Sequence, residues 1–280
     1  MNWRWLIRAG GYLLSALLLF VILTILFIPG QALLDLGNRA IAPQGLAVTA
    51  GSFGKAFPIG ISGRGWVLSS AKGELLKLDS GSVRLRILPL LTGKVSFAIN
   101  AVSGSGRLSA LASSSAGGSL TVEMSGLNLE QIPFFASVTG MKAQGVVNCR
   151  AEIGSIAKKA SGYVQVDARG VDLAGIRMGE TPLPDARYQT VQMMLRLKSG
   201  AAAIESFTLD GEGLYVRLKG DIHASETLQS APLDMIMELM PKPEFMEKQK
   251  FIFLLLSKYL DTPGHYQIPI KGILGKPLMQ

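Results

Sequence analysis

The chain has 280 residues and a formal net charge of +8, with 48% hydrophobic residues, 17% charged residues and 32 glycines. This composition is typical of strands and turns, and 7% aromatic residues is low for a platform that stacks nucleic-acid bases. The Lys and Arg residues are scattered rather than gathered in a run, so we expect no nucleic-acid partner. In an exported domain, this charge favours an anionic membrane surface or lipopolysaccharide.

The N-terminus carries an uncharged apolar run from Ala9 to Ile28. Its length matches the roughly 30 Å hydrocarbon core of a bilayer, so it predicts a transmembrane helix. Positive charge on one flank only predicts a cytoplasmic N-terminus and an exported remainder. The family resemblance given below implies that the membrane is a bacterial inner membrane and that the exported domain is periplasmic. The residues that set this anchor and its topology are Trp3, Arg4, Trp5 and Arg8.

A cleavable signal peptide is the alternative interpretation of this run. Signal peptides usually have an apolar region of about 7 to 15 residues, and this one is longer. The sequence Pro29–Ala32 also lacks a clear Ala-x-Ala cleavage site. We therefore expect residues 1–30 to form a cytoplasmic stub and anchor, 31–45 a juxtamembrane connector, and 46–280 a periplasmic antiparallel β domain.

Beyond the anchor, apolar and polar residues alternate with a period of two, which is typical of strands with one buried face. Turn clusters such as Ser103–Gly106 and Asp210–Gly213 separate these segments. The pattern predicts a mainly β fold, in which one long, curved antiparallel sheet forms a groove or half-open barrel. The residues expected to share its apolar face are Val83, Leu85, Ile87, Val95, Phe97, Ile99, Met193, Leu195, Leu197, Leu214, Val216 and Leu218.

Two helices are expected outside the anchor. One is a weak segment at residues 31–39, and the other runs from Pro243 to about Leu260. An apolar stripe along the second helix predicts packing on the sheet, whereas a contact with a membrane or a partner is the alternative. The stripe contains Phe245, Ile252, Leu256 and Tyr259.

Motifs that carry chemistry are nearly missing from the sequence. His223 and His265 are too far apart in sequence to form a ligand-spaced pair. Ser155–Lys158 matches Ser-x-x-Lys, but the Ser-Asp-Asn and Lys-Thr-Gly elements that accompany that motif are absent. Cys149 is the single cysteine, so an intramolecular disulfide is excluded. We therefore predict a protein that is not an enzyme, with no catalytic residues, metal ligands or cofactor.

Three segments resemble the type II secretion system protein N family. They are Phe57–Gly65, Gly211–Ile222 and Tyr266–Pro277, and the last also resembles the closing strand of AsmA-like periplasmic β proteins. The resemblance implies an accessory, inner-membrane component of type II secretion that contacts other components of that system. The wider group implies a groove that is involved in lipid movement.

Two functional hypotheses follow from these patterns. In the first, the exported sheet is a scaffold that contacts other secretion components by edge pairing or face packing. In the second, the apolar face is a groove that shields the acyl chains of phospholipid or lipopolysaccharide. A long sheet with an apolar face and few helices must curl, close or find a partner, and both hypotheses satisfy this requirement.

Overall fold

The computed structural model describes residues 30–57, 59–114, 117–156, 159–178, 181–225 and 230–280. The predicted anchor at residues 1–29 lies outside the described residues, and so do Trp3, Arg4, Trp5 and Arg8. Within the described ranges, no helix is both long and apolar enough to cross a membrane.

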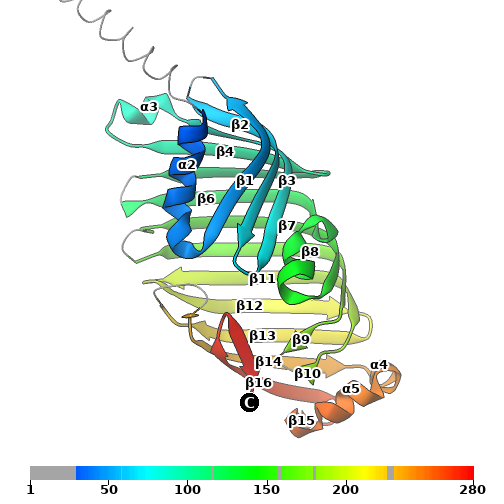
Figure 1. Cartoon of the computed structure of the whole chain (residues 1–280). Coiled ribbons are helices and arrows are strands. Elements are labelled where there is room, and N and C mark those ends of the chain that lie inside the picture. Colours follow the sequence, from blue (N-terminus) through cyan, green and yellow to red (C-terminus); the bar gives the residue numbers. More distant parts are fainter. Residues whose placement is uncertain (1–29, 58, 115–116, 157–158, 179–180, 226–229) are drawn as a thin grey trace, which may run out of the picture.

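One antiparallel sheet dominates the described part of the chain and contains fifteen strands there. The strands from β1 to β14 follow one another in chain order, apart from β9 (Arg177–Met178) and β10 (Thr181–Pro182), which form a separate hairpin. At the end of the sheet β16 pairs with β14, and β15 and β17 both pair with β16. The prediction of a mainly β fold with one large antiparallel sheet is confirmed (Figure 1). The sheet is open and does not close into a barrel. Its strands are β1 (Leu46–Lys55), β2 (Gly60–Ser70), β3 (Gly73–Leu85), β4 (Ser96–Ser103), β5 (Gly106–Ser113), β6 (Ser119–Asn128), β7 (Lys142–Gly154), β8 (Ser161–Ala174), β11 (Ala186–Lys198), β12 (Ala201–Gly211), β13 (Leu214–Ile222), β14 (Leu233–Pro241), β15 (Leu260–Thr262), β16 (His265–Ile273) and β17 (Lys276–Met279).

The helices of the described chain are short. The longest, α2 (Gly30–Ile41), contains the segment predicted at residues 31–39. The others are η1 (Ala42–Gln44), α3 (Ile87–Leu90), η3 (Leu129–Gln131), η4 (Phe135–Thr139), α4 (Pro243–Lys248), α5 (Lys250–Leu255) and η6 (Ser257–Tyr259).

The single helix predicted at residues 243–260 is wrong, because the segment breaks into α4, α5 and η6. The first break is at Gln249, whose φ of −119° and ψ of 31° are not helical. Its side-chain amide accepts a hydrogen bond from the backbone N–H of Asp185 and donates one to the carbonyl of the same residue. This anchoring to the loop before β11 turns the chain at a position where the apolar stripe alone predicts continuity.

The strands predicted to include Ile87 and Val95 are shorter than expected. The last β3–β4 pair joins Leu85 to Phe97, and Ile87 lies in α3 instead. The chain must reverse here, and it does so through local hydrogen bonds such as that from the N–H of Leu91 to the carbonyl of Leu88. Val95 lies just before β4 and is exposed. The paired strands therefore end before the alternation of apolar and polar residues in the sequence ends.

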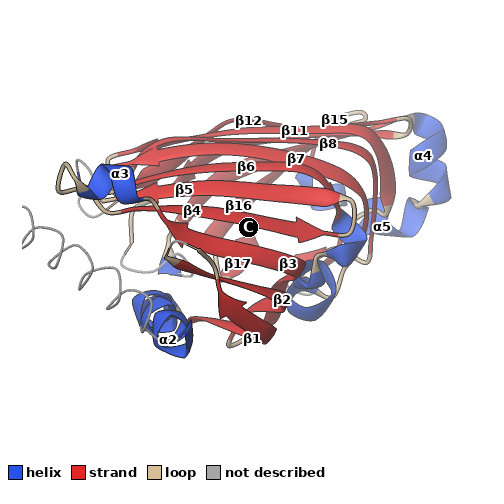
Figure 2. Cartoon of the chain, turned by 90° about the horizontal axis from the view of Figure 1, so that it is seen from above, coloured by secondary structure: helices blue, strands red, loops and turns tan. Residues whose placement is uncertain are grey.

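The sheet curls so that its first strands pass in front of the later ones (Figures 1 and 2). At the turn between β2 and β3, the Nζ of Lys72 donates a hydrogen bond to the carbonyl of Gly275, between β16 and β17, at 3.1 Å. The start of β3 also contacts η4, where the Oγ of Ser137 donates a hydrogen bond to the carbonyl of Glu74. The β2–β3 and β16–β17 hairpins therefore meet across the curl, although no strand pairing closes it in the described chain.

The edge of the sheet at β1 is covered in part by α2. The side chain of Asn38 donates to the carbonyl of Val48 at 2.9 Å and accepts from its N–H at 2.8 Å. This contact imitates one rung of a strand ladder. Because exposed edges invite pairing with other chains, Asn38 blocks edge association at this position.

Candidate functional site

The inner face of the curled sheet carries an unbroken row of apolar side chains. Residues that face each other in neighbouring antiparallel strands project from the same side of a sheet. The register therefore defines a row that crosses β2 to β8, β11 and β12. Its members are Ile61, Val83, Ile99, Ala110, Val122, Ala151, Val164, Leu195 and Ile204.

A second apolar row runs parallel to the first and extends to the end of the sheet. We call the two rows together the apolar face. The second row contains Gly81, Ala101, Leu108, Met124, Cys149, Val166, Met193, Phe207, Leu218, Met237 and Ile268. Small residues of the apolar face, such as Ala101 and Ala110, are buried, whereas Asn100 and Ser109 beside them are exposed. The apolar face is therefore the sheltered one.

The structure brings most of the predicted face residues together. Val83 lies opposite Ile99 and Leu85 lies opposite Phe97, as their alternation predicts. On the later strands, Met193, Leu195 and Leu197 of β11 share the face with Leu214, Val216 and Leu218 of β13, with β12 between them. Ile87 and Val95 do not join these rows, for the reason given above.

The apolar face changes from partly open to closed along the sheet. The side chains of Val83, Ile99, Val122, Val164 and Leu195 are only half-buried. We call this part, the stretch of the first row from Val83 to Leu195, the open half.

In the later strands the same face forms the closed core of the protein. Leu214 and Val216 are buried there, which differs from the open trough expected at these positions. The covering side chains come from the C-terminal helical segment, in which Phe253, Leu256 and Tyr259 belong to the same cluster of buried residues. The expected packing of this segment on the sheet is therefore what the structure shows.

An apolar pocket of about 430 Å³ lies at one end of the open half. It is formed where the β5–β6 and β7–β8 turns approach the start of β4. Its side walls include Val95, Phe97, Ala112, Leu120 and Ile156. Ala112 lies opposite Phe97 and Leu120 in the register, so the pocket continues the apolar face.

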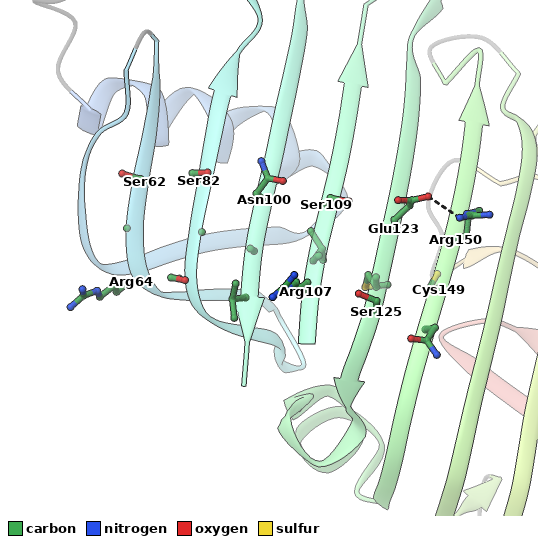
Figure 3. Close-up of a pocket in the computed structure, with 18 of the residues that line it drawn as sticks. Ser62, Arg64, Ser82, Asn100, Arg107, Ser109, Glu123, Ser125, Cys149 and Arg150 are labelled. Carbon is green, nitrogen blue, oxygen red and sulfur yellow. Dashed lines mark ion pairs between the residues drawn. The ribbon is translucent and has the colours of Figure 1, made fainter. Parts of the chain in front are cut away.

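The opposite face of the same strands is polar. A row of polar side chains crosses β2 to β8 and lines an open depression of about 1120 Å³ (Figure 3). Within it, the Nη2 of Arg150 lies 3.0 Å from the Oε1 of Glu123, and both side chains are exposed. The row contains Ser62, Ser82, Asn100, Ser109, Glu123, Arg150 and Gln165.

The alanines and Cys149 on the apolar face are residues that the sequence analysis missed. The period-two pattern of Leu108, Ala110 and Ala112 could have identified them, but alanine carries too little hydrophobicity to mark a buried face by itself. Cys149 lies between Met124 and Val166, and burial raises the pKa of its thiol. It therefore stays protonated at neutral pH and acts as a small apolar side chain.

No group of three or more His, Cys, Asp or Glu side chains in the described ranges could hold a metal ion. The Nδ1 of His265 lies 3.3 Å from a carboxylate oxygen of Asp261, which is an exposed, local contact four residues away.

Comparisons with known proteins found no match for this chain. No protein-family model matches the chain, no curated protein matches it, and no solved structure matches it.

Proposed function

We propose that the protein is a non-enzymatic, membrane-anchored lipid-binding protein that holds acyl chains against the open half of its apolar face. The observation that carries this proposal is the apolar row from Ile61 to Ile204, which crosses the sheet without a polar side chain. In the open half, its larger members are only half-buried. An acyl chain would remove this apolar area from water and needs no hydrogen-bond partner.

The uncharged run Ala9–Ile28 completes the proposal by placing the sheet beside a bilayer. In this arrangement the N-terminus is cytoplasmic and the sheet is in the periplasm, next to the inner membrane. The lipid would be phospholipid or the acyl part of lipopolysaccharide.

Photo-crosslinking of the full chain in living cells tests the proposal. Leu195 and Arg196 are adjacent in β11 and point to opposite faces of the sheet, so they form a matched pair. A photoreactive residue at Leu195, or at Ile99 of β4, is expected to yield adducts that contain lipid by mass spectrometry. The same residue at Arg196 is expected to yield none. Equal lipid capture at Leu195 and Arg196, or no lipid at Leu195 and Ile99, would refute the proposal.

The second candidate function is an accessory scaffold in the inner-membrane platform of type II secretion. It is supported by the resemblance of Phe57–Gly65, Gly211–Ile222 and Tyr266–Pro277 to the protein N family. It is also supported by the large apolar side chains of Phe251 and Leu254, which α5 leaves exposed. Photo-crosslinking from Leu254 is expected to capture a secretion component in this case, and adducts at Leu195 would contain protein without lipid.

A further inference from the structure

The short helix α3 gathers exposed apolar side chains at one end of the molecule. Leu88 is 75% exposed and Leu91 is 80% exposed, and Phe57 in the β1–β2 turn is 84% exposed. These segments are neighbours, because the N–H of Leu85 donates to the carbonyl of Ile59 at 2.8 Å. Large apolar side chains that are exposed together commonly mark a binding surface.

We call this part of the protein the α3 end. It comprises α3 and the β1–β2 turn with Phe57, which the hydrogen bond between Leu85 and Ile59 holds side by side (Figure 1). The helix α2 also begins at this end (Figure 1). The chain that precedes Gly30, including the apolar run Ala9–Ile28, therefore joins the described structure here.

Charge distinguishes the α3 end from the opposite end of the molecule. Its described residues, 53–57, 59–61 and 84–96, contain no Asp or Glu, and they include Lys55, Arg84, Arg86 and Lys94. At the opposite end, α4 and its neighbours carry both signs, with Glu244 and Glu247 beside Lys248 and Lys250.

We infer that the α3 end docks on an anionic bilayer, with Phe57, Leu88 and Leu91 inserted at the interface. Exposed apolar side chains flanked by cations match both layers of such an interface, since the acyl region takes the side chains and anionic headgroups take the cations. Arg86 and Lys94, which flank α3, are the cations closest to it in sequence. The join to the apolar run supports a bilayer as the occupant in preference to a second protein.

This inference deepens the proposed function and rests on it only in its last step. The apolar pocket of about 430 Å³ lies at the α3 end, next to Val95 and Phe97. Docking would therefore bring this pocket, at the end of the apolar face, next to the bilayer. Acyl chains could then move between the bilayer and the apolar face without crossing water.

The test uses the full chain in vesicles of phosphatidylcholine, with or without phosphatidylglycerol. Cys149→Ala first removes the native thiol and keeps a small apolar side chain in the row, and Leu88→Cys then carries an environment-sensitive NBD label. Leu254→Cys on α5 is the matched control, because Leu254 is also an exposed leucine of a short helix, 67% exposed. We expect blue-shifted emission at position 88 that spin-labelled lipid quenches, and water-like emission at position 254.

Neutralising the flanking cations gives a second measurement. Each removed charge is expected to lower the docked-to-undocked ratio about fivefold, so Arg86→Gln with Lys94→Gln should lower it about 25-fold in vesicles with phosphatidylglycerol. In phosphatidylcholine alone, the pair of substitutions should change little.

The remaining outcomes contradict the inference in different ways. Water-like emission at position 88, or equal shifts at positions 88 and 254, would refute selective docking. A shift that spin-labelled lipid does not quench would assign the α3 end to a protein partner or a second copy. Photo-crosslinking at Leu195 reads the acyl-chain face independently, so lipid capture there with a solvated position 88 would refute docking and leave the proposed function standing.

Discussion

The open half and the closed core of the apolar face have the same kind of side chain but different surroundings. Ile99 and Ile268 both project from the apolar face, yet Ile99 is half-buried and Ile268 is 0% exposed. The difference comes from what covers each part, because Ile268 shares a buried cluster with Phe253, Leu256 and Tyr259 of the C-terminal helical segment, and Ile99 does not belong to that cluster. Alternation along a strand therefore predicts which face is apolar, and distant segments decide whether that face becomes core or surface.

The largest expected effect is on truncation of the closed core. Ile268→Ala should lower the free energy of unfolding by about 2 to 5 kcal/mol, because it leaves a cavity among fully buried neighbours. Ile99→Ala removes the same atoms from a half-open site and should cost about 1 kcal/mol. Denaturant unfolding of both variants of the full chain in detergent measures the difference. Equal losses would mean that the two parts are buried alike.

Enlarging a side chain should also destabilise the closed core more than the open half. Val216→Trp overfills a buried position and should cost about 1 to 3 kcal/mol. Val122→Trp, in the open half, should change the free energy of unfolding by less than about 0.5 kcal/mol, because the larger ring can extend into the groove. It should also reduce lipid capture by a photoreactive residue at Ile99. A strongly destabilised Val122→Trp protein would show that the open half is closely packed.

An intermediate case is Phe97, whose predicted strand pattern suggests burial. Burying an unpaired carboxylate would cost on the order of 3 kcal/mol or more. The structure leaves Phe97 41% exposed, beside the apolar pocket, so Phe97→Asp should cost only about 1 kcal/mol. Leu214→Asp, at a fully buried position, is the comparison that should unfold the protein. Thermal denaturation distinguishes the two, and similar melting temperatures would contradict the exposure of Phe97.

The smallest effect concerns an ion pair on the opposite face of the strands that carry the closed core. The Nζ of Lys219 donates to the Oε1 of the buried Glu238 at 2.6 Å, and this bond holds the pKa of Glu238 below its ordinary value. Because the folded pKa is depressed, the stabilisation is present above the ordinary value of 4.5 and is lost as the pH falls through the lower folded value.

Removal of the Lys219 ammonium therefore has a predictable pH signature. Lys219→Met should lose stability mainly above pH 4.5 and show a flatter acid profile than the native protein. Lys242→Met, at an exposed position, is the control and should leave the profile unchanged. Chemical unfolding at several pH values measures both variants. A native profile in Lys219→Met would show that the pair does not stabilise the fold.

Local patterning accounts for the parts of the fold that the sequence predicts. The pairing of Val83 with Ile99 follows from alternation and from a connection short enough to join neighbouring strands. The positions that differ depend on remote contacts. Gln249 breaks the C-terminal helix by binding Asp185, 64 residues away in sequence, and no local signal reports such a contact.

The candidate site is predictable to a similar extent. Alternation correctly groups Met193 and Leu195 with Leu218, because side-chain direction in a strand is a local property. It does not identify the alanines of the same rows, and it cannot separate the open half from the closed core. That distinction depends on where the last hairpin and the C-terminal helices pack after the whole chain has folded.

The hydrogen bond from Lys72 to Gly275 also sets an order of events during synthesis. From β1 to β14, each neighbouring strand pair in the main sheet can form as soon as its second strand emerges, because these strands follow one another in chain order. The contact between the β2–β3 and β16–β17 hairpins spans 203 residues and must wait for nearly the whole chain. During synthesis the sheet could therefore assemble strand by strand. Its apolar face would stay uncovered until the contact between Lys72 and Gly275 has formed and the C-terminal helices have packed.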